Sequence, residues 1–362
     1  MRNLTAILLA LALVAPTLLA DTIVLRGQPA ISGVKVQKED LLEIAYTKGT
    51  GGRRLTVPTV DVIEVIYDAP PTEYRLGVES LNLGDAVNAI PHLEASLRDE
   101  VGQAPWVKEY AGVALGRAYL ASGRFGDAVK TFDAALTAKP DSRFLKKIAF
   151  DLALCHAKLA DSAKAISALD KLQQTVESKK VPGTWSLEAQ VMKGEVLIAS
   201  GKPGDAATAM QDYASKNQPR DDADPKAPLW VRAKRLQVEA LIAAKNVDLA
   251  KGVAKDLQDK SGQGPWAEAA SRNARAAVAI AEKATGNELL RAAELLVRAK
   301  TENSRAVSEL PTTCYLLGLV HLGLDGTLTG AKALAKSYFD ETLRRFPESR
   351  EAFLAREQLK KI

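Results

Sequence analysis

The chain has 362 residues, of which 26% are charged, with a formal net charge of +5 and two cysteines. Lys and Arg alternate with Asp and Glu along the sequence, which argues against the basic stripe of a nucleic-acid-binding protein. Cys155 and Cys314 stand far apart among apolar residues, so we expect two small buried thiols and no disulfide. Two cysteines also exclude a disulfide framework.

The first 20 residues predict a secretory signal peptide, because Arg2 precedes an apolar run from Leu4 to Val14 and Ala20 is a small residue at the cleavage position. We expect the mature chain to begin at Asp21, with a net charge of +4 once Arg2 is removed. A retained membrane anchor is the alternative, although the run is shorter than the roughly 20 residues that span a bilayer.

Residues 21–69 predict a small β-rich domain, because short runs of β-branched residues alternate with glycine or charged turns. The glycines within Lys48–Arg54 are expected to form a hairpin tip and not a phosphate loop, since a strand and not a helix follows them. The pattern resembles small SH3-like or Sm-like β-domains of exported bacterial proteins. The five expected strands are Thr22–Leu25, Gly33–Val36, Leu41–Tyr46, Arg54–Val57 and Val60–Tyr67.

The most regular pattern of the chain lies between residues 115 and 140. Small residues there allow two antiparallel helices to approach, large ones fill the space between them, and a proline ends the second helix. The eight positions are Leu115, Gly116, Tyr119, Gly123, Ala128, Phe132, Ala135 and Pro140. In order and spacing they resemble one repeat of the tetratricopeptide repeat (TPR) family, whose members usually bind other proteins.

Prolines recur every 34 to 46 residues through the Ala- and Leu-rich remainder, at positions 71, 105, 140, 182, 228, 265, 311 and 347. This spacing is typical of successive helical hairpins with insertions. We therefore predict a mainly α fold: an α-α superhelix, a TPR solenoid of about seven hairpins over 71–362, behind the β-rich domain. The third hairpin departs from the pattern, because Ala160 stands at its turn where the first, second and fourth have Gly84, Gly123 and Gly201.

Two further segments stand out in this region. The polar stretch Ala214 to Pro228 is expected to be an exposed loop, with a hinge or a partner contact as the alternatives. Ser349 to Lys360 is expected to form a last helix, charged around most of its surface, that caps an open solenoid end. Together with Ala335 to Pro347 it resembles the closing repeats of periplasmic TPR proteins in envelope assembly.

All four tryptophans closely follow the recurring prolines, at Trp106, Trp185, Trp230 and Trp266. Each ring is expected to cover the start of a hairpin against the preceding repeat, because a residue placed once per repeat serves the interface between repeats. The alternative is a row of aromatic ligand contacts.

No pattern of catalytic or metal-binding residues is found. His92, His156 and His321 lie in different predicted hairpins, more than 60 residues apart, whereas a metal site needs several such groups close together. Nucleophile elbows, Walker sequences and dinucleotide fingerprints are also missing. We therefore expect neither an enzyme nor a bound cofactor or metal.

The TPR resemblance implies that the first helix of each hairpin lines a concave groove that binds a protein or peptide. The family's contact positions correspond here to Tyr74, Arg75, Arg117, Lys147, Phe150, Glu195, Arg232, Arg235 and Glu239. Basic residues outnumber acidic ones in this set, which favours an acidic or extended peptide. Val113 and Ala114 stand where a carboxylate-clamp TPR would supply part of its Asn and Lys pattern, which argues against a chaperone-tail clamp.

These observations predict an exported scaffold protein that mediates protein–protein interactions in the periplasm or cell envelope. One alternative is a fixed subunit of an envelope-assembly or secretion complex, with the β-rich domain docked on a membrane partner. A second alternative is a cell-wall glycan-binding module that uses the tryptophan row.

Overall fold

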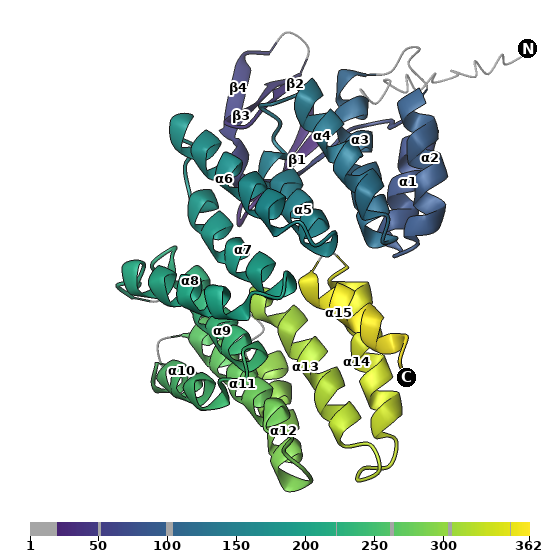
Figure 1. Cartoon of the computed structure of the whole chain (residues 1–362). Helices are drawn as coiled ribbons and strands as arrows, with labels where there is room; N and C mark the ends of the chain where they lie inside the picture. Colours follow the sequence, from purple (N-terminus) through teal and green to yellow (C-terminus); the bar gives the residue numbers. More distant parts are fainter. Residues whose placement is uncertain are drawn as a thin grey trace, which may run out of the picture. The chain divides into compact units, whose positions relative to one another are not determined.

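A computed structural model describes residues 20–49, 52–98, 104–221, 223–260, 264–302, 306–347 and 349–362. The predicted signal peptide, apart from Ala20, lies outside the described residues. The chain divides into two compact units, one ending at Pro70 and the other spanning Pro71–Ile362. Figure 1 shows an all-β unit followed by a helical unit.

The first unit is a five-stranded antiparallel sheet in the order β4-β3-β2-β1-β5. Its strands are β1 (Asp21–Leu25), β2 (Ile31–Glu39), β3 (Glu43–Lys48), β4 (Arg54–Pro58) and β5 (Val62–Ile66). The core is formed by inward-facing residues such as Ile23, Ile44 and Val65. Leu41 and Leu42, which we expected in the third strand, belong instead to a turn, because Asp40 Oδ1 accepts hydrogen bonds from the backbone N–H groups of Leu42 and Glu43.

The second unit consists, in its described residues, of fifteen α-helices that form seven hairpins and one terminal helix. This matches the count expected from the proline spacing. The helices are α1 (Thr72–Asn82), α2 (Ala86–Arg98), α3 (Pro105–Ala121), α4 (Phe125–Ala138), α5 (Leu145–Lys158), α6 (Ser162–Ser178), α7 (Trp185–Ala199), α8 (Pro203–Lys216), α9 (Ala227–Ala243), α10 (Val247–Asp259), α11 (Pro265–Ala281), α12 (Asn287–Glu302), α13 (Leu310–Gly323), α14 (Ala331–Arg345) and α15 (Arg350–Leu359).

Close helix contacts within the hairpins explain the pattern of small and large residues. A methyl group on Gly116 in α3 would lie 2.4 Å from Cε1 of Phe132 in α4, so only glycine allows that ring to pack there. Gly318 in α13 and Phe339 in α14 repeat the arrangement, with a corresponding distance of 2.3 Å. The same pair of residue types thus holds together the second and the seventh hairpins.

The turn of the third hairpin adopts the regular conformation without the regular residue. Gly84, Gly123 and Gly201 have positive φ angles of 82°, 81° and 71° at the turns of three other hairpins. Ala160 takes the same left-handed conformation, with φ of 60°. Because a Cβ atom makes this conformation unfavourable, the third hairpin is less well matched to its turn.

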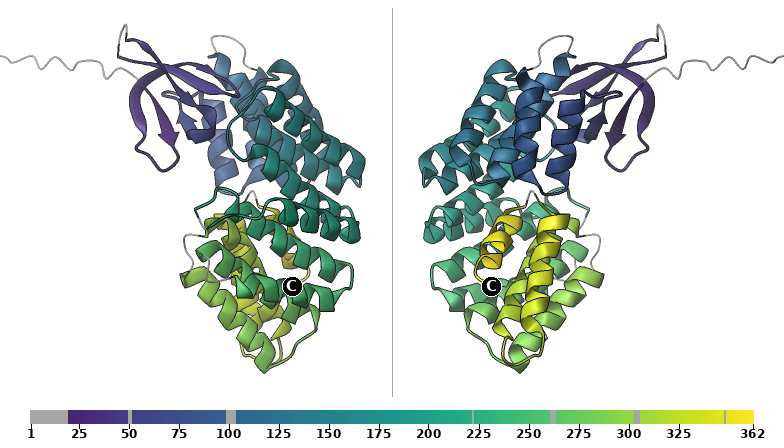
Figure 2. Two further views of the ribbon diagram at one scale, coloured as in Figure 1. Left: turned by 90° about the vertical axis from the view of Figure 1, so that its left-hand side faces the viewer. Right: turned by 90° about the vertical axis from the view of Figure 1, so that its right-hand side faces the viewer.

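The first helices of successive hairpins pack on one another, from α1 on α3 through to α13 on α15, and form one layer of the unit. The terminal helix α15 packs at the end of the stack and also lies against earlier hairpins (Figures 1 and 2). Arg356 Nη1 donates to the backbone oxygen of Ala121 at 2.8 Å, and Arg350 Nη1 lies 2.7 Å from Glu239 Oε2. The predicted last helix is present, and it contacts the second and fifth hairpins as well as the seventh.

Candidate partner-binding site

Four of the predicted groove residues come together on α7 and α9. Arg232 in α9 donates through Nη2 to Glu195 Oε1 in α7 at 2.5 Å. One turn later in α9, Arg235 pairs with the carboxylate of Glu239, and its Nε lies 2.9 Å from Glu309 Oε2. The spacing of three and four residues places these α9 side chains on one face of the helix.

Residues near the C-terminus complete this group. Arg350, the first residue of α15, pairs with Glu239, and Glu351 accepts a 2.8 Å hydrogen bond from Thr312 Oγ1. Asn273 Nδ2 donates to Glu309 Oε2 at 3.2 Å. We call this set the inner network: Glu195, Arg232, Arg235, Glu239, Glu309, Arg350 and Glu351.

The inner network satisfies its own charges within the chain. Arg235 is only 3% exposed, and two carboxylates approach it. Burial alone would lower the pKa of Arg235, but Glu309 and Glu239 raise it above its ordinary value. Burial alone would raise the pKa of Glu239, but Arg350 and Arg235 hold it below its ordinary value. Both groups are therefore kept charged by intramolecular pairing.

The remaining predicted groove residues lie apart from the inner network. Tyr74 makes an edge-to-face contact with Trp106, at 5.4 Å between ring centroids, and Arg75 is exposed and pairs with Glu79. Phe150 packs on a small core around α5 to α7. Arg117 Nε lies 3.8 Å from Asp151 Oδ2. Burial raises the pKa of Asp151, and the charges of Arg117 and the half-buried Lys147 partly offset this rise.

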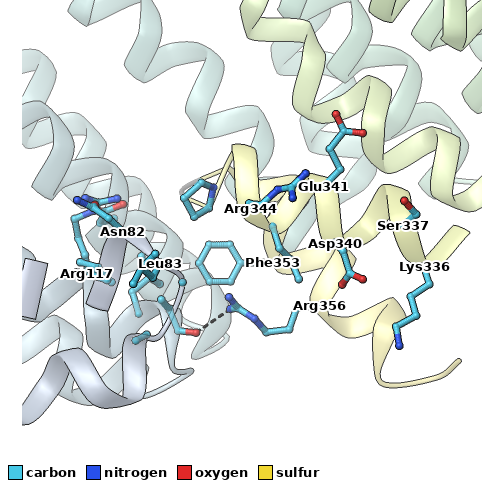
Figure 3. Close-up of a pocket in the computed structure, with 18 of the residues that line it drawn as sticks. Asn82, Leu83, Arg117, Lys336, Ser337, Asp340, Glu341, Arg344, Phe353 and Arg356 are labelled. Carbon is cyan, nitrogen blue, oxygen red and sulfur yellow. Dashed lines mark hydrogen bonds and ion pairs between the residues drawn. The ribbon is translucent and has the colours of Figure 1, made fainter. Parts of the chain in front are cut away.

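A large pocket lies where the first hairpins meet the last one, and the sequence analysis did not predict it. It has a volume of about 840 Å³. One wall is formed by the α1–α2 turn and the end of α3, and the other by α14 and α15 (Figure 3). We call it the seam pocket. Of the predicted groove residues only Arg117 lines it, because the pocket depends on α15 folding back.

The charges of the seam pocket are paired less completely than those of the inner network. Arg356 is half-buried and donates to a backbone carbonyl, and its burial lowers the pKa of the guanidinium. Lys336, Asp340 and Arg344 line the pocket as exposed side chains on α14 (Figure 3). Glu341 also lines it, but its carboxylate is already bonded to Lys300 and Arg345.

A second, smaller cavity of about 270 Å³ adjoins the inner network. Its walls are mainly apolar side chains from α9, α11 and α13, among them Ile242, Ile280 and Leu316. Glu239 and Arg350 close one side. This space is large enough for one apolar side chain.

The tryptophans serve the packing between repeats, as expected. Trp230 is 3% exposed, and its Nε1 donates to the backbone oxygen of Ala214 in the preceding hairpin at 2.9 Å. Trp185 is also buried, whereas Trp106 lies between Tyr74 and Tyr110 in a series of edge-to-face contacts. The four rings therefore do not form an open row of ligand contacts.

The cysteines and histidines have structural surroundings. Cys155 and Cys314 are free and buried, and burial raises their thiol pKa values to about 12 and about 11. His321 is buried and bonds through Nδ1 to the backbone oxygen of Leu317, whereas His92 contacts Glu73. Across the described ranges no three potential ligands come together to hold a metal. Nor do those ranges include a helix with the length and apolar character needed to cross a bilayer.

The architecture defines an α-helical repeat solenoid with a β unit before it. Residues 113–142 match the family model described as "Tetratricopeptide repeat", which covers the hairpin of Gly116 and Phe132. This part of the second hairpin therefore has the sequence pattern of one tetratricopeptide repeat.

Two further comparisons were made. A solved tetratricopeptide repeat protein from Parabacteroides merdae is similar over 80% of this chain and 98% of its own, with 17% identity and a TM-score of 0.41. No curated protein matches the sequence.

Proposed function

We propose that this protein is an exported, non-catalytic scaffold that binds a protein partner in the periplasm or cell envelope. The observation that carries the proposal is the stack of seven helical hairpins, one of which matches the TPR family model. Repeats of this kind typically bind proteins, because the stacked first helices provide one extended surface. The apolar N-terminal sequence supports export.

The inner network limits where a partner can bind. Glu195, Arg235 and Glu239 already have partners within the chain, and α15 covers this part of the helix layer. A partner that used them would have to replace α15. Lys147 on α5 is half-buried and lies outside the inner network, so it can be changed without breaking that network.

The proposal can be tested by cross-linking and affinity capture from envelope extract of the native host, with the mature chain as bait. We expect capture of one or more proteins that is reduced by Lys147→Glu on α5. Lys130→Glu is the matched control, because Lys130 is exposed on α4, the second helix of its hairpin. Capture that is equal for both variants and the unaltered chain would contradict the proposal. Cell fractionation tests the location: a chain found only in the cytoplasm would contradict export.

A fixed subunit of an envelope-assembly or secretion complex is a second candidate, favoured by the two edge strands of the β unit. Leu55 on β4 and Ile66 on β5 are exposed apolar side chains on these edges. Edge strands with exposed apolar residues are suited to pairing with another chain. This candidate predicts a stoichiometric complex that survives high salt and is lost on Leu55→Lys with Ile66→Lys.

The burial of Trp185 and Trp230 counts against the glycan-binding alternative. Unchanged tryptophan fluorescence on addition of cell-wall fragments would agree with this conclusion.

A further inference from the structure

The seam pocket brings together segments from both ends of the helical unit. Its volume of about 840 Å³ lies within the range of about 300–1,000 Å³ that is usual for ligand sites. It has room for a few side chains of an extended peptide, and it is too small for a helix of several turns.

The hydrogen bonding of Arg356 is the first observation that points to a ligand site. Its guanidinium carries five N–H donors, and the structure shows one hydrogen bond, to the backbone oxygen of Ala121 at 2.8 Å. The group also lies 5.7 Å from the ring centroid of Phe353. No carboxylate within the described residues forms an ion pair with it, although it is half-buried. Burial accordingly lowers its pKa. A bound anion would offset this loss of hydration.

The other charged residues of the pocket leave it with an excess of cations. Arg117, Lys336, Arg344 and Arg356 line it, against the carboxylates of Asp151, Asp340 and Glu341. Glu341 is bonded to Lys300 and Arg345, which lie outside the lining. The lining therefore holds four cations and three carboxylates, and one of these carboxylates is already paired outside it.

Apolar side chains lie beside these cations. Leu83, in the turn between α1 and α2, is 85% exposed, although a leucine side chain is usually at least partly covered. Phe353 stands near the middle of the pocket, between Leu83 and Arg356 in the view of Figure 3. Leu120 and Leu343 add apolar surface from α3 and α14.

We propose that the seam pocket binds a short acidic segment of the partner protein, whose carboxylates pair with Arg356 and Arg344 and whose apolar side chains pack on Leu83 and Phe353. The proposal rests on the protein-binding function proposed above and names the chemistry of the partner. Arginine suits this role because its fork of donors matches the two oxygens of a carboxylate. The bound carboxylate would add to, or replace, the carbonyl of Ala121 as the acceptor for Arg356.

The test uses the mature chain and a fluorescein-labelled peptide, Leu-Glu-Leu-Glu-Glu-Leu, in fluorescence anisotropy at low ionic strength. We expect this peptide to bind at least about tenfold more tightly than its twin with glutamine at every glutamate position, a difference of ~1.4 kcal/mol. The affinity should fall as salt is added, because exposed charges take part. Equal binding of the two peptides, or none, would overturn the proposal.

Three variants place the binding in the pocket. Arg344→Glu with Arg356→Glu is expected to weaken binding at least about tenfold. Leu83→Ser is expected to weaken it severalfold, and it keeps the fold because Leu83 is exposed. Lys130→Glu with Arg298→Glu makes the same charge change at exposed positions outside the pocket, and is expected to leave the affinity unchanged. Pocket variants that bind as well as this control would overturn the proposal.

The experiment also separates this inference from the proposed function. Peptide binding needs no natural partner, whereas capture from envelope extract needs no knowledge of the segment bound. If Lys147→Glu reduces capture and the acidic peptide does not bind, the scaffold function stands and the pocket assignment is wrong. Sedimentation with phosphatidylglycerol vesicles, lost in the pocket variants and without peptide binding, would assign the pocket to an anionic membrane surface and overturn the peptide proposal.

Discussion

The inner network and the seam pocket are both rich in arginine, but they use it in different ways. In the inner network Arg235 is enclosed by Glu239 and Glu309, and α15 supplies Arg350 and Glu351. In the seam pocket Arg356 has a backbone carbonyl as its acceptor. Charges that the chain neutralises serve folding, whereas charges left without a carboxylate can serve a ligand. Stability and binding should therefore respond oppositely to changes at the two places.

The largest effect on stability is expected from Arg235→Met. Removal of this cation leaves Glu239 and Glu309 with one fewer partner in a buried site, and breaking a buried pair in this way typically costs about 3–5 kcal/mol. Urea unfolding followed by circular dichroism measures the loss. Arg298→Met is the control, because Arg298 is exposed and pairs with Glu294 on its own helix, where such a pair contributes about 0.3–0.5 kcal/mol. Similar losses for both variants would show that the inner network is not a stabilising unit.

A smaller and pH-dependent effect is expected from Glu239→Gln. The pKa of Glu239 is lower in the folded chain than its unfolded value of about 4.3, so its charge contributes stability above that pH. This contribution is lost as the pH falls through the folded pKa. The variant should lose about 1–3 kcal/mol at pH 7, and its difference from the unaltered chain should shrink below about pH 4. A difference that is constant from pH 7 to pH 3 would contradict the assignment of charge to Glu239.

Arg356→Gln is expected to reduce the free energy of unfolding by about 1 kcal/mol, the usual contribution of one hydrogen bond. Affinity for the acidic peptide should fall by about tenfold in the same variant. At Arg235 the loss of stability is expected to be the main effect, whereas at Arg356 it is the loss of peptide affinity. Thermal unfolding and anisotropy measured on the same samples therefore compare the two places directly. A large loss of stability with unchanged affinity would place Arg356 among the folding contacts.

The smallest stability change is expected from Arg344→Gln. Its side chain is exposed on α14, so the free energy of unfolding should change by no more than about 0.5 kcal/mol. Peptide affinity should still fall severalfold at low salt, and the loss should shrink at high salt. Lys130→Gln, tested alongside, should alter neither quantity.

The sequence could predict those parts of the molecule whose contacts are local. Gly116 and Phe132 are 16 residues apart, and their pairing is expected from the repeat pattern and found in the structure. Ala160 was recognised as a departure from the pattern, and it adopts the left-handed turn that the pattern requires. Turns within the β unit were less predictable, because the side chain of Asp40 and not the apolar run decides where the third strand begins.

Long-range contacts of α15 could not be predicted from the sequence. The repeat positions pointed to Glu195, Arg232, Arg235 and Glu239, and the structure brings these four together. Arg350 and Arg356 were missed as site residues, because a charged last helix is equally typical of a solvated cap. Their partners lie 111 and 235 positions away, and no periodicity in the sequence links such positions. The buried Ala352 and Ala355, three residues apart, lie on the packed face of α15.

The contacts of α15 also have a consequence for biosynthesis. An ordinary repeat array can fold from its first units onward as the chain emerges, since each unit needs only its neighbours. Here Ala121 and Glu239 receive their partners from residues 350–356, which are translated 235 and 111 positions after them. The completed helical unit can therefore form only after α15 has been translated.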